Sequence, residues 1–271
     1  YYWYMTEPLL FHKTCLHPTS NEWDVFVHGA GGSSSTWFKH IKAYKQHFNL
    51  VLIDLRGHGK SNQLLKELMT SRYTFTEVTQ DILKVLDHLK IQSAHFVGMS
   101  LGTIIVRNLA ELASDRVDSM VLGGAVTRLN TRSQILVKLG NFAKHILPYM
   151  WLYKLFAYIV MPQRNQRESR HLFIREAKKL CQKEFKRWFI LAADVNPLMK
   201  YFKDRELAIP TLYLMGDRDY MFIQPVKEMV AAHKLSVLRE IPNCGHVCNV
   251  ERPEDFNQYS IEFIKQQTLV A

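Results

Sequence analysis

The stretch "HFVGMSLGT", residues 95–103, joins a run of strand-forming residues to a run of helix-forming residues. A Gly-x-Ser-x-Gly pattern at such a junction holds its serine, Ser100, in a strained backbone so that the hydroxyl projects above the sheet. Gly98 and Gly102 stand where larger side chains would press on neighbouring backbone. The start of the next helix, including the N–H of Leu101, points at the place where negative charge would develop. The stretch predicts a nucleophile, with a plain glycine-rich turn as the alternative.

Short apolar runs ending at turn residues alternate with helical patterns along the chain. Strands are expected over 24–28, 50–54, 94–98, 117–124, 210–216 and 235–241. Helices are expected over 76–89, 101–112 and 254–265, and Thr74 with Glu77 makes a capping box at the start of the first. Strands that alternate with helices predict an α/β fold with a doubly wound, mostly parallel sheet.

More than eighty residues without a convincing strand separate the fourth and fifth expected strands. A segment of this length is too long for a loop. The sequence therefore predicts a core of residues 1–124 and 208–271 and an inserted helical cap, or lid, of residues 125–207. The longest apolar stretch of this cap, 146–161, contains Pro148 and Lys154 and is shorter than the ~20 residues of a spanning helix. We expect it to be a buried or interfacial helix.

The composition fits one α/β domain with an insertion: the chain has 271 residues, of which 47% are hydrophobic. The N-terminal stretch lacks a basic region and a cleavage-site pattern, so no signal peptide is indicated. The four cysteines are scattered and do not form a disulfide framework, which favours a reducing, cytoplasmic setting; they are Cys15, Cys181, Cys244 and Cys248.

The positive charge is concentrated in the middle of the chain. The net charge is +10, and residues 124–206 carry 17 Lys and Arg against 6 Asp and Glu. Such a basic surface is most often only solvated. The alternatives are weak contact with an anionic membrane surface or attraction of an anionic substrate. No nucleic-acid-binding motif accompanies the charge, so nucleic acid is not an expected partner. The pattern leaves the oligomeric state open.

The glycine-rich loop "VHGAGG", residues 27–32, directly follows the first expected strand. Such a loop lets the backbone approach a ligand closely, and here it would present the N–H of Ala30 to the same oxyanion as Leu101. His28, Gly29 and Gly31 would support the loop. The spacing is not Gly-x-Gly-x-x-Gly and no Gly-Lys-Ser/Thr follows, which argues against a phosphate-binding loop.

An acid and a base follow the fifth and sixth expected strands. Asp217 and Asp219 lie in "GDRD", and His246 follows a glycine in "NCGHVC". Both loops fall at the carboxyl ends of strands, where ligands bind in an open α/β sheet. The order serine, aspartate, histidine is that of one known triad arrangement, with either aspartate as the acid.

These motifs together resemble the α/β-hydrolase superfamily, in its cap-bearing, carboxylesterase-like branch with a serine nucleophile. The resemblance runs from about residue 24 to 263 and rests on "HGAGG", "DLRGHGKS" at 54–61, "GMSLG", "GDRD" and "GHVCNVERPEDF". It implies that Asp219 is the acid and that Asp217 forms the turn. It also implies that Arg56 and His58 brace the site. Haloalkane dehalogenases and epoxide hydrolases carry an aspartate in place of Ser100, which argues against both.

The expected function is hydrolysis of an ester or related acyl bond of a small or lipid-like molecule by Ser100, His246 and Asp219. No cofactor is required for this chemistry. A carbon–carbon bond hydrolase, a thioesterase or a menaquinone-pathway-type lyase would share the triad. A ligand-binding sensor on the same fold is the alternative outside enzymes.

Two smaller expectations concern metals and the cap. Cysteine and histidine cluster in "HKTCLH" at 12–17 and "CGHVC" at 244–248, but neither has the paired spacing of a zinc site, so no metal is expected. Cap aromatics are expected mainly in the core, with some lining an acyl pocket; they include Trp151, Tyr153, Phe156 and Trp188.

Overall fold

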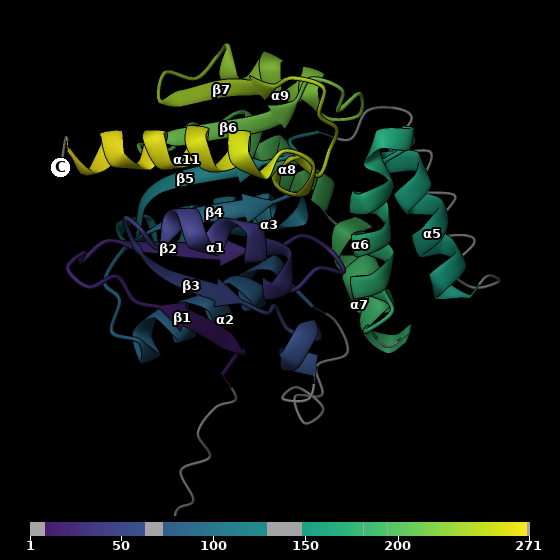
Figure 1. Ribbon diagram of the computed structural model, residues 1–271, viewed down its shortest axis with the longest axis horizontal. Coiled ribbons are helices and arrows are strands. Elements are labelled where there is room, and N and C mark those ends of the chain that lie inside the picture. The colour runs from purple at the N-terminus through teal and green to yellow at the C-terminus, as the bar shows by residue number, and fades with distance from the viewer. Residues whose placement is uncertain (1–8, 63–72, 129–147, 181, 194, 270–271) are drawn as a thin grey trace, which may run out of the picture.

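One sheet organises the residues that the computed structural model describes, which are 9–62, 73–128, 148–180, 182–193 and 195–269 (Figure 1). Across these residues seven strands follow the order β1-β3-β2-β4-β5-β6-β7. All neighbours are parallel except β1 and β3. The strands are β1 (His12–Cys15), β2 (Trp23–Val27), β3 (Asn49–Ile53), β4 (Ala94–Met99), β5 (Val117–Gly123), β6 (Thr211–Gly216) and β7 (Ser236–Ile241). The predicted doubly wound, mostly parallel α/β sheet is confirmed.

The edge strand β1 is an element that the sequence did not indicate. It has four residues, "HKTC", and pairs antiparallel with β3, with His12 opposite Ile53. An edge strand half open to water needs no apolar run, so its sequence looks like a loop. The six predicted strands agree with the structure to within one residue at each end.

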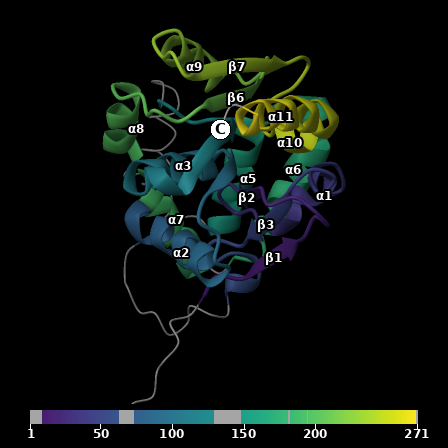
Figure 2. The same ribbon diagram turned by 90° about the vertical axis from the view of Figure 1, so that its left-hand side faces the viewer.

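Helices cover both faces of the sheet, as Figure 2 shows along the strands. One face carries α2 (Phe75–His88), α3 (Leu101–Leu112) and α9 (Ile223–Val230), and the other carries α1 (Phe38–Tyr44) and α11 (Pro253–Thr268). Consecutive side chains of β2 point to opposite faces of the sheet and pack against the two helical layers alternately. Val25 and Val27 pack under α2 and α3, whereas Phe26 packs with α1 and α11. Burial on both faces explains the continuous apolar runs of the central strands.

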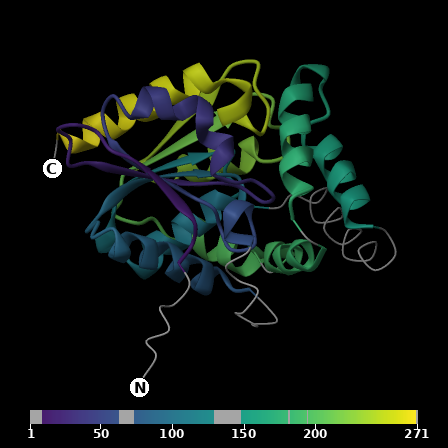
Figure 3. The same ribbon diagram turned by 60° about the horizontal axis from the view of Figure 1, so that its bottom comes forward.

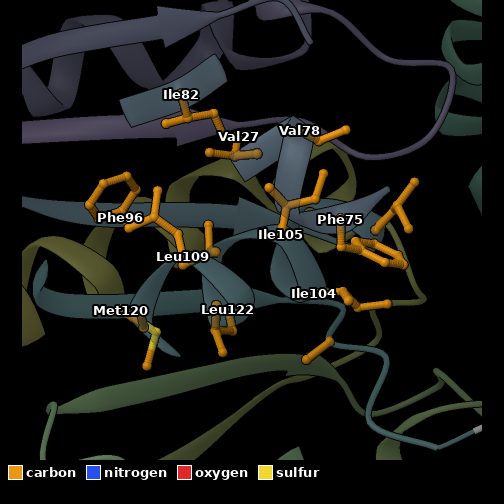
Figure 4. Close-up of a cluster of buried hydrophobic side chains, with 14 of the residues drawn as sticks. Val27, Phe75, Val78, Ile82, Phe96, Ile104, Ile105, Leu109, Met120 and Leu122 are labelled. Carbon is orange, nitrogen blue, oxygen red and sulfur yellow. The ribbon is translucent and has the colours of Figure 1, made fainter. Parts of the chain in front are cut away.

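Helix α2 shows how sequence sets this packing. Thr74 caps its start, accepting a hydrogen bond from the Glu77 N–H, and the Glu77 carboxylate accepts from the Thr74 N–H in return. Val78 and Ile82 lie one turn apart on the buried side, and Figure 4 shows them close to Ile105 of α3 in the core under the sheet. Truncating such a buried Ile to Ala would cost about 2–5 kcal/mol.

In the described part of the chain between β5 and β6, the regular elements are all helices. Its helices are α5 (Tyr149–Val160), α6 (Arg167–Ala177), α7 (Gln182–Ala193) and α8 (Val195–Lys203). Figures 1 and 3 show α5, α6 and α7 beyond the carboxyl ends of the strands. Helix α8 instead packs beside α3, with the Arg107 guanidinium 5.0 Å from the centre of the Phe202 ring. The division into core and cap at residues 125 and 207 stays a prediction.

Two further observations complete the fold. The helix expected over 146–161 is α5, while residues 146 and 147 lie outside the described residues, as does Cys181. In the described parts of the chain, no helix is long and apolar enough to cross a membrane.

Candidate active site

The turn between β4 and α3 forces an unusual backbone on Ser100. Its φ of 52° and ψ of −117° lie in a region that L-residues rarely adopt. The Ser100 N–H donates to the Gly123 carbonyl oxygen at 2.9 Å, which ties the turn to β5. Gly102 lies so close to β2 that an added Cβ would collide with the Val27 carbonyl oxygen, and one at Gly98 would lie 2.9 Å from the Gly102 carbonyl oxygen. The two glycines therefore permit a turn that presents a serine hydroxyl.

Three loops bring a serine, a histidine and an aspartate into one hydrogen-bonded line. His246 Nε2 lies 2.9 Å from Ser100 Oγ, and His246 Nδ1 lies 2.8 Å from Asp219 Oδ2. His246 and Asp219 are buried. A carboxylate accepts only, so Nδ1 carries the proton and Nε2 is free to accept the proton of Ser100. This is the arrangement that nucleophilic catalysis by a serine requires.

The two aspartates of "GDRD" have separate contacts. Asp219 faces His246, whereas Asp217 Oδ1 accepts a hydrogen bond from the Cys244 N–H at 3.0 Å. Asp217 therefore links the acid loop to the loop that carries the histidine. The geometry places Asp219 at the acid position and Asp217 in the turn.

A glutamate that the sequence reasoning missed holds the histidine loop. Glu251 Oε2 accepts a hydrogen bond from the Gly245 N–H at 2.8 Å, directly before His246. Gln166, from the short helix η4 (Arg164–Gln166), donates to Glu251 Oε1 at 3.5 Å. Burial raises the pKa of Glu251. Its place five residues after the histidine was the only sequence signal for this role.

The glycine-rich loop after β2 lies against the nucleophile turn. A Cβ at Gly29 would lie 3.0 Å from the Met99 carbonyl oxygen and 3.2 Å from Ser100 Cβ. Within the described residues, the N–H groups of Ala30 and Leu101 have no hydrogen-bond partner. Two free donors beside the serine fit the predicted oxyanion hole.

The peptide between Ala30 and Gly31 is held at both ends. Tyr153 of α5 donates its hydroxyl proton to the Ala30 carbonyl oxygen at 2.7 Å, and the Gly31 N–H donates to His58 Nε2 at 3.0 Å. Gly31 has a φ of 69°, and an added Cβ would collide with the Tyr153 hydroxyl. Burial raises the pKa of Tyr153, so the phenol stays a donor. No local sequence pattern indicates this contact, which spans more than 120 residues.

Two neutral histidines brace the same loop. His58 accepts from Gly31 through Nε2, so its proton sits on Nδ1, which lies 3.1 Å from the Arg56 carbonyl oxygen. His28 Nε2 accepts from the Leu55 N–H at 3.1 Å. Burial is the main cause that lowers the pKa of both, that of His58 well below its usual value. The bracing role expected of His28 and His58 matches these contacts.

Residues between β5 and β6 contact four segments around the site, those of Ala30, Arg56, Tyr220 and Glu251. Besides Tyr153, the Trp188 indole N–H donates to the Arg56 carbonyl oxygen at 3.0 Å. Tyr220 of the acid loop donates its hydroxyl to the Ile159 carbonyl oxygen at the end of α5. The helices beyond the strand ends are therefore bonded to the oxyanion loop, the Arg56 loop and the acid loop.

The expectation that cap aromatics lie mainly in the core is half right. Tyr153 and Trp188 are buried, but Trp151 is 70% and Phe156 43% exposed. Trp151 lies on the side of α5 that faces away from the cap's own cluster, which includes Leu152. A high density of aromatics in the sequence does not say on which face of a helix each one falls.

One group of described residues could hold a metal ion. The ligand atoms of Glu22, His95 and Asp118 all lie within 4.8 Å of one another at the amino-terminal edge of the sheet. His95 already contacts Ser119 Oγ at 2.8 Å and Glu22 Oε2 at 3.2 Å. Neither cysteine–histidine motif of the sequence takes part.

Comparison with known proteins agrees with this geometry. A family described as the α/β hydrolase fold matches residues 25–151. The chain is 25% identical over 250 residues to 3-oxoadipate enol-lactonase 1 of Acinetobacter baylyi, covering 89% of this chain and 88% of the relative. It is 27% identical to the dihydrolipoyllysine-residue acetyltransferase component of the acetoin cleaving system of Pseudomonas putida, covering 89% of this chain but only 63% of that protein.

A solved structure shares the same architecture. The crystal structure of the enol-lactonase from Burkholderia xenovorans matches with a TM-score of 0.77 at 20% identity, covering 94% of this chain and 96% of that chain. The family match and the structural match thus agree with the nucleophile turn, the loop after β2 and the sheet order described above. Residues 25–151 thus match the α/β-hydrolase family, and the described chain has the fold of that superfamily.

Proposed function

We propose that the protein is a serine hydrolase that cleaves a carboxylic ester or related acyl bond through an acyl-enzyme. The observation that carries this proposal is the continuous line from Ser100 Oγ through His246 to Asp219, with distances of 2.9 and 2.8 Å. The names of relatives, which include enol-lactonases, support an ester or lactone as the bond. The substrate is a small or lipid-like acyl compound.

The first half of the reaction forms the acyl-enzyme. Ser100 Oγ attacks the carbonyl carbon while its proton moves to His246 Nε2, and Asp219 stabilises the resulting imidazolium. The N–H groups of Ala30 and Leu101 hold the oxyanion, helped by the positive end of α3. When the tetrahedral intermediate collapses, His246 passes its proton to the departing alcohol. The acyl group then remains on Ser100.

The second half releases the acid. Water gives a proton to His246 Nε2 as it attacks the acyl carbon, and the same two N–H groups hold the new oxyanion. Collapse returns the proton to Ser100 Oγ and frees the carboxylic acid. Every proton in this cycle moves through side chains of the chain, so the proposed reaction needs no cofactor. We also propose a cytoplasmic location, supported by the scattered cysteines.

Covalent labelling tests the proposal. A fluorophosphonate is expected to modify Ser100, because this serine has both a base and two free N–H donors beside it. Ser119→Ala is the matched control: Ser119 also contacts a histidine, His95, but is fully buried in β5. Ser100→Ala should lose labelling and lower kcat by several orders of magnitude, while Ser119→Ala keeps both. An adduct located by mass spectrometry on another serine would overturn the assignment.

Substrate panels separate the remaining activities. Turnover of p-nitrophenyl esters supports the proposal. Labelling of Ser100 without turnover of any ester or thioester would favour a lyase, a carbon–carbon bond hydrolase or a ligand-binding protein on the same fold.

A further inference from the structure

Helix α5 exposes an apolar stripe to solvent among the residues that the structure describes. Trp151, Leu155 and Tyr158 follow at helical spacing and are 70%, 56% and 57% exposed. Lys154 lies on the same side and is exposed. We call these four residues the α5 stripe. A surface helix normally presents polar residues to water, so an apolar solvent face indicates a binding surface.

The other side of α5 is already used for packing. Leu152 and Tyr153 join the cap's own cluster with Phe185, and Ala157 and Val160 join the main core. A rotation of α5 that buried the stripe would expose these packed residues instead. Such a rotation would also remove Tyr153 from the Ala30 carbonyl.

The elements that follow α5 in the chain carry several exposed basic side chains. Helix α6 lies beside α5, as Figures 1 and 3 show, and η4 precedes it. The exposed basic residues of these two elements and of the turn after α6 are Arg164, Arg167, Arg175, Lys178 and Lys179, the last of which is paired with the buried Glu176. The exposed acid of this region, Glu168, is paired with Lys39 at 3.1 Å. The neighbourhood is thus positive, in line with the 17 basic and 6 acidic residues of 124–206.

We propose that the α5 stripe docks on an anionic lipid bilayer. Trp and Tyr side chains favour the boundary between headgroups and acyl chains, and the exposed Lys and Arg of the elements that follow α5 favour anionic headgroups. Helix α5 has 12 residues, fewer than the ~20 that a bilayer requires, so it would lie in the plane of the interface. A second copy of the chain is a poorer occupant, because it would bring the same positive charge against this one.

This proposal goes beyond the proposed hydrolase function and does not depend on it. The residues of the stripe contact neither the triad nor the loop of Ala30. Docking and hydrolysis of a water-soluble ester can therefore be measured and lost separately.

Vesicle co-sedimentation of the full chain tests the proposal. The probes are vesicles of phosphatidylcholine alone and of phosphatidylcholine mixed with phosphatidylglycerol, at low and at physiological salt. Binding to the anionic vesicles alone, weaker at higher salt, is the expected result, because salt screens the headgroup charge. Equal pelleting with neutral and anionic vesicles, or none with either, would overturn it.

Substitutions distinguish docking through the α5 stripe from non-specific adsorption to vesicles. Trp151→Gln combined with Leu155→Gln should weaken vesicle binding about tenfold through lost apolar burial. The matched control is Phe38→Gln with Leu112→Gln, two side chains exposed by 61% and 51% on other helices, which should bind like the parent. All four positions are exposed, so hydrolysis of a soluble ester should stay unchanged.

The charge contribution has its own variant. Arg164→Gln with Arg167→Gln should weaken binding about fivefold for each charge that reaches the surface. If the stripe and control variants bind equally, the α5 stripe is not the docking face. If sedimentation velocity instead shows a dimer that Trp151→Gln dissociates, the occupant is a second copy and the membrane proposal is wrong.

Discussion

The Tyr153 hydroxyl is the contact through which the cap reaches the oxyanion loop, and Tyr153→Phe removes only that contact. The ring stays in its packing with Phe173 and Phe185, at centroid distances of 4.6 and 5.7 Å. The lost interaction is the 2.7 Å hydrogen bond to the Ala30 carbonyl oxygen. The peptide that follows Ala30 is then held at one end alone, by His58.

The size of the effect follows from what the bond restrains. A neutral hydrogen bond contributes about 1 kcal/mol to stability, which corresponds to about fivefold in an equilibrium constant. Complete loss of one oxyanion donor lowers kcat about 10²–10³-fold. Because Tyr153 restrains the Ala30 donor without being the donor, we expect kcat to fall about tenfold. KM should change little, since the substrate carbonyl gains its charge only in the transition state.

Tyr149→Phe provides the matched control. Tyr149 lies one turn before Tyr153 on α5 and donates to the Leu180 carbonyl oxygen at 2.9 Å, inside the cap. Both variants should lower the melting temperature by similar amounts, but only Tyr153→Phe should lower kcat on p-nitrophenyl acetate. Equal kcat values for the two variants would refute the idea that Tyr153 positions the oxyanion loop.

Three other predictions concern the acid, a buried histidine and a glycine. Asp219→Asn should lower kcat about 10⁴-fold by favouring the wrong tautomer of the histidine, whereas Asp217→Asn should cost far less; reversed penalties would refute the assignment. Burial lowers the pKa of His40 to about 4, so the unfolded chain binds the extra proton below about pH 6.5. The free energy of unfolding in urea should fall by about 3 kcal/mol from this group as pH drops from 6.5 to 4, and His40→Gln should show a shallower slope; equal slopes would contradict this. Gly102→Ala should destabilise the fold in thermal unfolding despite better helix propensity, because its Cβ meets the Val27 carbonyl; a higher melting temperature would contradict the packing.

The sequence predicted the parts of the protein that local chemistry determines. Buried strands and the capped start of α2 carry their own signals, and six strands and α2 appear where they were expected. The loops of Ser100, Asp219 and His246 were found because glycines and chain order mark them. The distances among these three side chains could not be predicted from the sequence, because they depend on where three strand ends meet.

Contacts fixed by tertiary packing had no local signal. Tyr153 reaches Ala30 because α5 lies over the strand ends, and nothing near residue 153 indicates that. Gln166 likewise contacts Glu251, which lies 85 residues further along the chain, and nothing near residue 166 indicates that contact. The exposure of Trp151 likewise depends on which side of α5 faces the core. Strand β1 was missed because a short, half-exposed edge strand lacks an apolar run.

The fastening of the cap to the catalytic loops limits how evolution or engineering can alter this protein. Exchanging residues 149–193 for the corresponding segment of a relative would replace the helices beyond the strand ends, and it would also remove the partners of Ala30, Glu251 and the Arg56 carbonyl. The catalytic loops of such a chimera would be held less firmly. Exchanged segments that retain Tyr153, Gln166 and Trp188 should keep turnover, because these three side chains hold the loops of the site. Segments that lack them should lower the rate even where they fold correctly.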